Sequence, residues 1–300
     1  MDSRRGAALA ALLVAARGAT LYCPQQTDLN DESEGGATFA DGGWTLTGNG
    51  RVSSKTSWNL LGGFIEFDMD VSRTADGVNT NLYIRRADMP RTGRGDAAAA
   101  TWRFRGDESP RLRRGSSVDW SETGARRRYT VSPTVPNTGK ETYCDIQQSS
   151  TGQDSCMEMD VIENNGKCAM ATTIHTFATD GQPGDQDCDR WGCQVSALLP
   201  SAVFHVKASF GADGSLSVSL NDGGKMTDYS PYPSDASNAV VVSTMSSVGA
   251  AIESSQWSGW APPGPSGDCP SGGDLDSSVV TISNVTVFGD VVQGPEPTAC

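Results

Sequence analysis

The chain has 300 residues, with 34 glycines and few apolar patterns of helical period, which favours an all-β domain with a sizeable core. Its formal net charge of −13 argues against a nucleic-acid partner and suits a soluble exported protein. The even number of cysteines, 8, predicts disulfides formed in an oxidising compartment.

The N-terminus has the features of a signal peptide. Arg4 and Arg5 precede the apolar run Gly6 to Ala16, and Ala16-Arg17-Gly18 provides small residues for cleavage. We therefore expect residues 1–19 to be removed and residues 20–300 to form a single secreted domain with no membrane attachment. Asn284-Val285-Thr286 is a glycosylation sequon and fits export.

Several segments alternate apolar and polar residues with the period of two that is typical of half-buried strands. Short strands separated by glycine-rich turns predict a β-sandwich or jelly roll. The expected strands are Phe64 to Val71, a hairpin of Phe204 to Phe210 and Leu216 to Leu220 turning at Gly211 to Gly214, a buried run Ala239 to Val242, and a last pair marked by Val280, Ile282, Val285, Val287 and Val291.

An arginine-rich segment interrupts this pattern. The stretch from Arg85 to Arg128 holds more than half of the 23 Lys and Arg residues and shows no periodicity. A structureless loop of this length is unusual inside a compact domain. It is consistent with a disordered insertion at about 86–137, an anion-binding loop, or translated non-coding sequence; the first and third are favoured.

The chemistry is expected in the acidic motif Glu158-Met159-Asp160-Val161-Ile162-Glu163. On a strand, Glu158 and Asp160 point to one face, and a β-bulge within 161–162 would return Glu163 to that face. The carboxyl groups of Glu158 and Glu163 would then approach to about 5 Å, the separation of a retaining glycosidase. Alone, the motif is weak evidence, because three acids within six residues of an acidic chain more often form only a solvated strand face.

The roles of the three acids follow from their charges. A nucleophile must be ionised while the acid is protonated, and neighbouring like charges disfavour ionising both. We assign Glu158 as nucleophile, Glu163 as acid/base and Asp160 as the residue that orients and tunes them. No cofactor or metal is needed; the spacing of Cys188, Cys193 and His175 matches no zinc pattern.

The chain resembles glycoside hydrolase family 7, the fungal-type cellulases, and more loosely family 16. The resemblance runs collinearly from about Phe64 to Val287. Its motifs are Phe67-Asp68-Met69-Asp70-Val71-Ser72, Gly77-Val78-Asn79, Leu82-Tyr83, Tyr143-Cys144-Asp145-x-Gln147, the acidic motif followed by Asn164-Asn165, Trp257 counted from Met245-Ser246, and the closing Val280 to Val285. It implies a concanavalin A-like β-sandwich (jelly roll).

The resemblance also implies site residues and disulfides. Asp145 and Gln147 would line the cleavage point, His175 would lie near the acid, and Trp257 would stack on a sugar ring. The implied disulfides are Cys144–Cys156 and Cys168–Cys188, which leaves Cys193–Cys269 and Cys23–Cys300 by elimination. Val248 replaces a second cleft tryptophan, and the long loops of processive members are absent, which implies an open substrate groove.

Taken together, these features predict a secreted, monomeric, retaining glycoside hydrolase that cuts β-1,4-glucan internally, with a polysaccharide as its partner. A β-1,3-glucanase or transglycosylase of family 16 type is the alternative within the same chemistry. A non-catalytic carbohydrate-binding lectin on the same fold is the alternative from another class. The intact pair Glu158 and Glu163 favours an enzyme.

Overall fold

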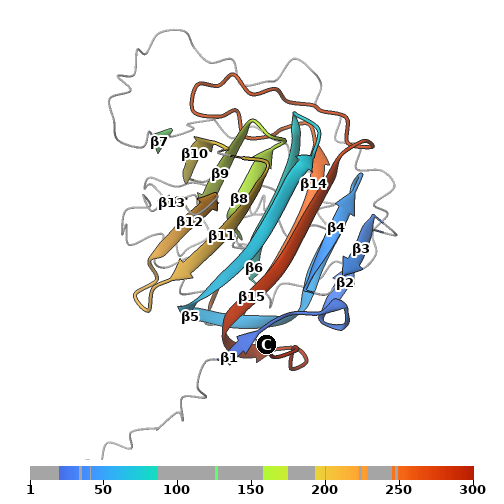
Figure 1. Cartoon of the computed structure of the whole chain (residues 1–300). Helices are drawn as coiled ribbons and strands as arrows, with labels where there is room; N and C mark the ends of the chain where they lie inside the picture. The colour runs from blue at the N-terminus through green and yellow to red at the C-terminus, as the bar shows by residue number, and fades with distance from the viewer. Residues whose placement is uncertain are drawn as a thin grey trace, which may run out of the picture.

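The computed structural model describes residues 20–33, 36–40, 42–86, 126–127, 158–174, 193–199, 201–222, 225–228, 245–246 and 249–300. Most of these residues are in β-strands, as predicted (Figure 1). The elements are β1 (Thr20–Tyr22), the 3₁₀ helix η1 (Gln26–Asp28), β2 (Leu29–Asp31), β3 (Ala37–Ala40), β4 (Gly43–Thr47), β5 (Arg51–Arg73), β6 (Val78–Arg86), β7 (Arg126–Arg127), β8 (Glu158–Asn165), β9 (Ala169–Ile174), β10 (Cys193–Leu198), β11 (Val203–Phe210), β12 (Leu216–Asp222), β13 (Lys225–Asp228), β14 (Ala250–Ser258) and β15 (Val279–Gln293).

The long strand β5 connects two layers. Its first half pairs with β14, which begins the order β14-β6-β8-β9-β10-β7; we call these strands the site sheet. Its second half pairs with β11 and β15, and with β12, β13 and β4 these form the outer sheet. The layers meet where the Asn164 amide nitrogen donates to Met69 Sδ at 3.0 Å, so the predicted sandwich is confirmed.

The core lies between the two sheets and is made by alternate residues of their strands. Ile65, Phe67 and Met69 of β5 are fully buried, whereas the residues between them are partly exposed. Leu82 and Ile162 of the site sheet belong to the same apolar cluster. Each large apolar side chain buried in this way contributes about 1.5–3 kcal/mol.

The predicted strand from Phe64 to Val71 is confirmed as the second half of β5. The predicted hairpin is also confirmed, because β11 and β12 pair antiparallel from His205 with Asn221 to Phe210 with Leu216. The apolar run Ala239 to Val242 lies outside the described residues.

The prediction of a last pair of strands is wrong, because the segment forms the single strand β15. Its pairing with β5 shifts between Ser283 and Thr286, and Asn284 has a φ of 53°. A bulge places two successive residues outward and so moves the apolar alternation by one position, from Ile282 to Val285. A turn would leave the same trace in the sequence.

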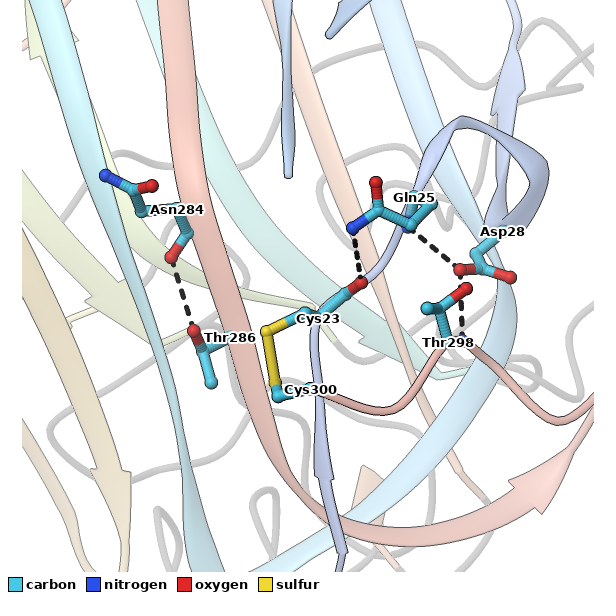
Figure 2. The surroundings of a disulfide bond; sticks show 7 residues. All are labelled: Cys23, Gln25, Asp28, Asn284, Thr286, Thr298 and Cys300. Carbon is cyan, nitrogen blue, oxygen red and sulfur yellow. Dashed lines mark hydrogen bonds between the residues drawn. A yellow bond between two sulfur atoms is a disulfide. The ribbon is translucent and has the colours of Figure 1, made fainter. Parts of the chain in front are cut away.

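Two disulfides are described. Cys23–Cys300 is confirmed and joins the segment after β1 to the last residue of the described chain (Figure 2). Cys168 is bonded to Cys269, which corrects both the Cys168–Cys188 pairing and the Cys193–Cys269 pairing. Cys168 lies in the β8–β9 turn, where Asp76 Oδ1 accepts from the neighbouring Lys167 amide at 3.3 Å, and this turn brings the cysteine to Cys269 of the β14–β15 connection.

The arginine-rich segment is partly described at its borders. Arg85 and Arg86 belong to β6, and Arg126–Arg127 form β7, which pairs with Val195 and Gln194 at the edge of the site sheet. Four of the arginines therefore lie in strands rather than in a structureless loop.

The predicted signal peptide and Cys144–Cys156 lie outside the described residues. Within the described ranges, no helix is long and apolar enough to cross a membrane.

Candidate active site

The acidic motif forms strand β8 at the centre of the site sheet. Against β6, Ile162 pairs with Leu82 while Asp160 pairs with Tyr83, so Val161 is an extra residue. The pairing with β9 shifts between Asp160 and Glu163 as well. The bulge predicted within 161–162 is confirmed.

The bulge brings Glu163 to the same face as Asp160, which regular alternation along a strand would not do. Asp160 lies opposite Thr173 of β9, and the Thr173 hydroxyl also donates to Glu163 Oε2 at 3.1 Å. Asp160 and Glu163 therefore present their side chains to the same face, and Glu158 joins them two residues before Asp160. All three are buried, with exposed fractions of 8%, 3% and 7% for Glu158, Asp160 and Glu163.

The Glu163 carboxyl group is held at both oxygens. Asn79 Nδ2 of β6 donates to Oε1 at 2.8 Å, and the Thr173 hydroxyl of β9 donates to Oε2. Both partners come from the strands that flank β8. Their contacts fix the orientation of the carboxyl group, which a proton-transferring acid needs.

A second polar cluster adjoins the acids on the same face. Arg85 Nε pairs with Glu253 Oε1, and the Tyr83 hydroxyl donates to Glu253 Oε2 at 2.6 Å. Arg85 and Glu253 are only 4% and 3% exposed. Burial lowers the pKa of Arg85, but the charge of Glu253 and its hydrogen bond outweigh this and hold that pKa above its ordinary value.

The connection from β14 to β15 closes one end of this face. It is the long orange-red trace at the top of Figure 1. Buried Asn165, the last residue of β8, donates to the Pro262 and Pro270 carbonyls at 2.8 and 2.6 Å and accepts from the Gly77 amide at 2.7 Å. The Cys168–Cys269 disulfide ties the same connection to the β8–β9 turn.

Two partly exposed tryptophans lie at the start of this connection. Trp257 is the second-last residue of β14 and pairs with Asn79, the residue that contacts Glu163. Its ring stacks on Trp260, with centroids 6.1 Å apart and planes inclined by 20°. The structure thus brings the predicted sugar-stacking Trp257 to the face that carries the acids, with Trp260 beside it.

The other predicted site residues cannot be located in the same way. Asp145, Gln147 and His175 lie outside the described residues, as do Cys144, Cys156 and Cys188. Glu158, Asp160, Glu163 and Trp257 are the predicted site residues that the structure brings together.

Sequence reasoning missed the polar residues that surround the acids. Asn79, Asn81, Tyr83 and Arg85 alternate along β6 and lie opposite β8, so a period of two was present as a signal. Glu253 gave no such signal, because its neighbours in β14 are both apolar and polar without alternation.

No protein-family model matches the sequence, and no curated protein matches it. Solved structures do match. A double mutant of the Humicola insolens endocellulase EGI has a TM-score of 0.51 at 16% identity, covering 88% of this chain and 79% of that chain. Another mutant of that organism's endocellulase, Cel7B (EG 1), has a TM-score of 0.50 at 15% identity, covering 84% and 77%. The shared feature is the fold, which confirms the jelly roll implied by the family 7 motifs; the looser family 16 resemblance stays a prediction.

Proposed function

We propose that this chain is a secreted retaining glycoside hydrolase that cuts β-1,4-glucan internally. The observation that carries the proposal is the bulge in β8, which gathers Glu158, Asp160 and Glu163 on one face. A strand without it would direct Glu163 into the core. The irregular strand pairing presents three carboxyl groups on one face, and packing of the core does not require such an arrangement.

The proposed reaction has two steps. In the first, Glu163 gives its proton to the glycosidic oxygen while a Glu158 oxygen attacks the anomeric carbon, and the bond to the leaving sugar breaks. In the second, Glu163 takes a proton from water, the water oxygen attacks the anomeric carbon, and Glu158 is released. Asp160 lies between the two in sequence and on their face, and would orient the nucleophile.

Support for a glucan substrate comes from two sources. The chain shares its fold with endocellulases. The stacked Trp257 and Trp260 offer aromatic faces beside the acids, and such faces bind sugar rings. Asp145, Gln147 and His175 complete the proposed site through the family resemblance. Cleavage within the chain follows from the open groove that the resemblance implies.

Support for export comes from the disulfides. Cys23–Cys300 and Cys168–Cys269 are consistent with folding in an oxidising compartment, as is the predicted signal peptide at 1–19. The mature protein is proposed to act outside the cell as a monomer.

The direct test is product analysis of the recombinant protein on carboxymethylcellulose, laminarin and xyloglucan. Mixed soluble oligosaccharides from carboxymethylcellulose are expected, with the initial products in the β-anomeric configuration by NMR. Release from laminarin or xyloglucan instead would favour the family 16 type of activity. Binding to glucan with no release of sugar would identify a lectin.

The Glu158→Gln substitution tests the assignment of the nucleophile. It keeps the shape of the side chain and removes the attacking oxygen, so kcat should fall by roughly a thousandfold or more. Glu66→Gln is the matched control, because Glu66 lies on the outer sheet in a partly exposed pair with Lys207 and should leave kcat unchanged. Full sugar release by the Glu158→Gln protein would refute the assignment.

A further inference from the structure

The buried pair of Arg85 and Glu253 is not explained by the two-step reaction. Arg85 lies directly opposite Glu158 in the pairing of β6 with β8. Residues opposite each other in antiparallel strands have Cβ atoms about 4.5–5.5 Å apart. Arg85 and the proposed nucleophile therefore occupy neighbouring positions on the site face.

Stability is a poor explanation for this pair. Removing two charges from water costs several kcal/mol each, and well-packed apolar residues of similar size serve a fold equally well or better. The pair is also fully engaged within the protein, with Arg85 bonded to Glu253 and Tyr83 bonded to the other Glu253 oxygen. At 4% exposure, Arg85 offers little surface to a substrate.

The charged groups around Glu158 define what Arg85 can do. Asp160 and Glu163 share its strand and its face, and Tyr83 and Arg85 face it from β6. On the other side, the described part of β9 contributes the uncharged Thr173. Glu253 lies on β14, beyond β6, and the charge of Glu32 has a smaller effect on Arg85 than that of Glu253. Arg85 is the positive charge among these described groups.

We propose that Arg85, held in place by Glu253 and Tyr83, is a positioning residue that keeps the Glu158 carboxyl group ionised beside two other acids. The charge of Arg85 favours the ionised form of Glu158 over that of Glu163, because Glu163 lies opposite the uncharged Asn81. The inference about the charge of Glu158 rests on geometry, and its meaning for catalysis rests on the proposed function.

The proposal predicts how the pH at which Glu158 takes up its proton changes in three variants. The double variant Arg85→Met with Glu253→Gln removes the pair without leaving a buried charge alone. Glu158 should then take up its proton at a pH higher by roughly half a unit to one unit. Glu253→Gln alone leaves Arg85 without its counter-charge, so Glu158 should take up its proton at a lower pH. Arg85→Lys keeps the charge and should stay close to the unaltered protein.

The measurement is carboxyl NMR of the full-length protein labelled with ¹³C at the glutamate side-chain carboxyl, with the Glu158 signal assigned by its loss in Glu158→Gln. The acidic limb of the pH dependence of kcat/KM should move with the NMR midpoint in each variant. A midpoint that is unchanged in the double variant, or that moves in the same direction in both charge variants, would overturn the role of Arg85.

The two proposals fail in different ways. Absence of sugar release by the unaltered protein would refute the hydrolase, while the NMR series would still decide whether Arg85 controls the charge of Glu158. Normal sugar release with no movement of the Glu158 midpoint would refute only the role of Arg85.

Discussion

Asn284 has three properties in one residue. It occupies the bulge of β15 with a φ of 53°, a conformation that Asn adopts more readily than most residues. Its side chain is exposed and donates from Nδ2 to Asp68 Oδ2 at 2.6 Å, while Asp68 Oδ1 contacts His205 Nδ1 at 2.8 Å. It also begins the sequon that ends at Thr286, on the outer sheet and away from the acids.

We predict that Asn284 carries an N-linked glycan when the chain is exported by a eukaryotic cell. The sugar replaces one hydrogen of Nδ2, and the other hydrogen can still donate to Asp68. Treatment with an amidase that removes N-glycans should lower the mass of the protein, and Asn284→Gln should abolish that change without altering kcat. Asn59→Gln, which is outside any sequon, is the control; an identical mass change in Asn284→Gln would contradict the prediction.

At the scale of single residues, the sequence predicted the acids but not their partners. Glu158, Asp160 and Glu163 could be found because their spacing suits retaining glycoside hydrolysis and because the motifs around them resemble family 7. Asn79 and Thr173 could not, since an amide and a hydroxyl at alternate strand positions are common on any solvated face. Their role depends on strand pairing, which joins residues 84 and 10 positions away from Glu163.

Among the elements, the end of β8 contacts the β14–β15 connection, which includes Trp260 and Cys269. Three hydrogen bonds of buried Asn165 bridge this connection and the β5–β6 turn. That turn approaches the connection closely, because a Cβ on Gly77 would lie 2.8 Å from the Gly273 amide nitrogen. Gly77 also has a φ of 85°, so a larger residue is excluded on both counts.

We predict that Asn165→Ala lowers the free energy of unfolding by about 3 kcal/mol, because the buried Gly77 amide, the buried Pro262 carbonyl and the part-buried Pro270 carbonyl lose their partner. Chemical denaturation monitored by tryptophan fluorescence measures the change. The control is Asn30→Ala, where a single part-buried contact of 3.3 Å to Ser53 predicts a loss below about 1 kcal/mol. Equal losses in the two variants would show that Asn165 does not anchor the connection.

The strands themselves were more predictable than the bulges and turns that interrupt or connect them. Alternation found the second half of β5 and the β11–β12 hairpin, because each has one face in the core. It also located the β8 bulge, since the acids had to share a face. It misjudged β15, because a bulge and a turn both shift the phase of an apolar pattern. Only the pairing partner, β5, distinguishes them.

For the whole molecule, the two ends of the described chain are fastened together. Beside the Cys23–Cys300 bond, the Thr298 amide donates to Asp28 Oδ2 at 3.1 Å (Figure 2). The Cys23 amide donates to the Thr298 carbonyl at 2.9 Å. The Tyr22 hydroxyl donates to Glu296 at 2.9 Å. These contacts hold β1 against β15 at the base of the outer sheet.

We predict that the double variant Cys23→Ala with Cys300→Ala loses about 3–5 kcal/mol of unfolding free energy. The disulfide separates its cysteines by 277 positions, and cross-links that close long loops restrict the unfolded chain most. Denaturation without reductant compares the variant with the unaltered protein. Reductant added to the unaltered protein also opens Cys168–Cys269 and should lower its stability at least as far. A variant of unchanged stability would show that the hydrogen bonds alone hold the ends.

For the whole molecule, only the fold class could be predicted from the sequence. Composition and motif order predicted a jelly roll, but the order of strands depends on contacts between distant segments. Eight cysteines allow 105 pairings, so the Cys168–Cys269 bond could not be deduced from spacing. The family resemblance suggested Cys188 for Cys168, whereas the turn at Lys167 and Cys168 takes it to the β14–β15 connection.

The Cys23–Cys300 bond also makes the backbone between its cysteines a covalent ring. A protease that cuts one peptide bond anywhere between Cys23 and Cys300, including within the arginine-rich segment, would leave a single molecule of unchanged mass apart from one added water. Both fragments would stay tethered and could hold the sandwich together. The cut would become visible on a gel only after reduction, so the nicked protein would remain one covalently joined molecule.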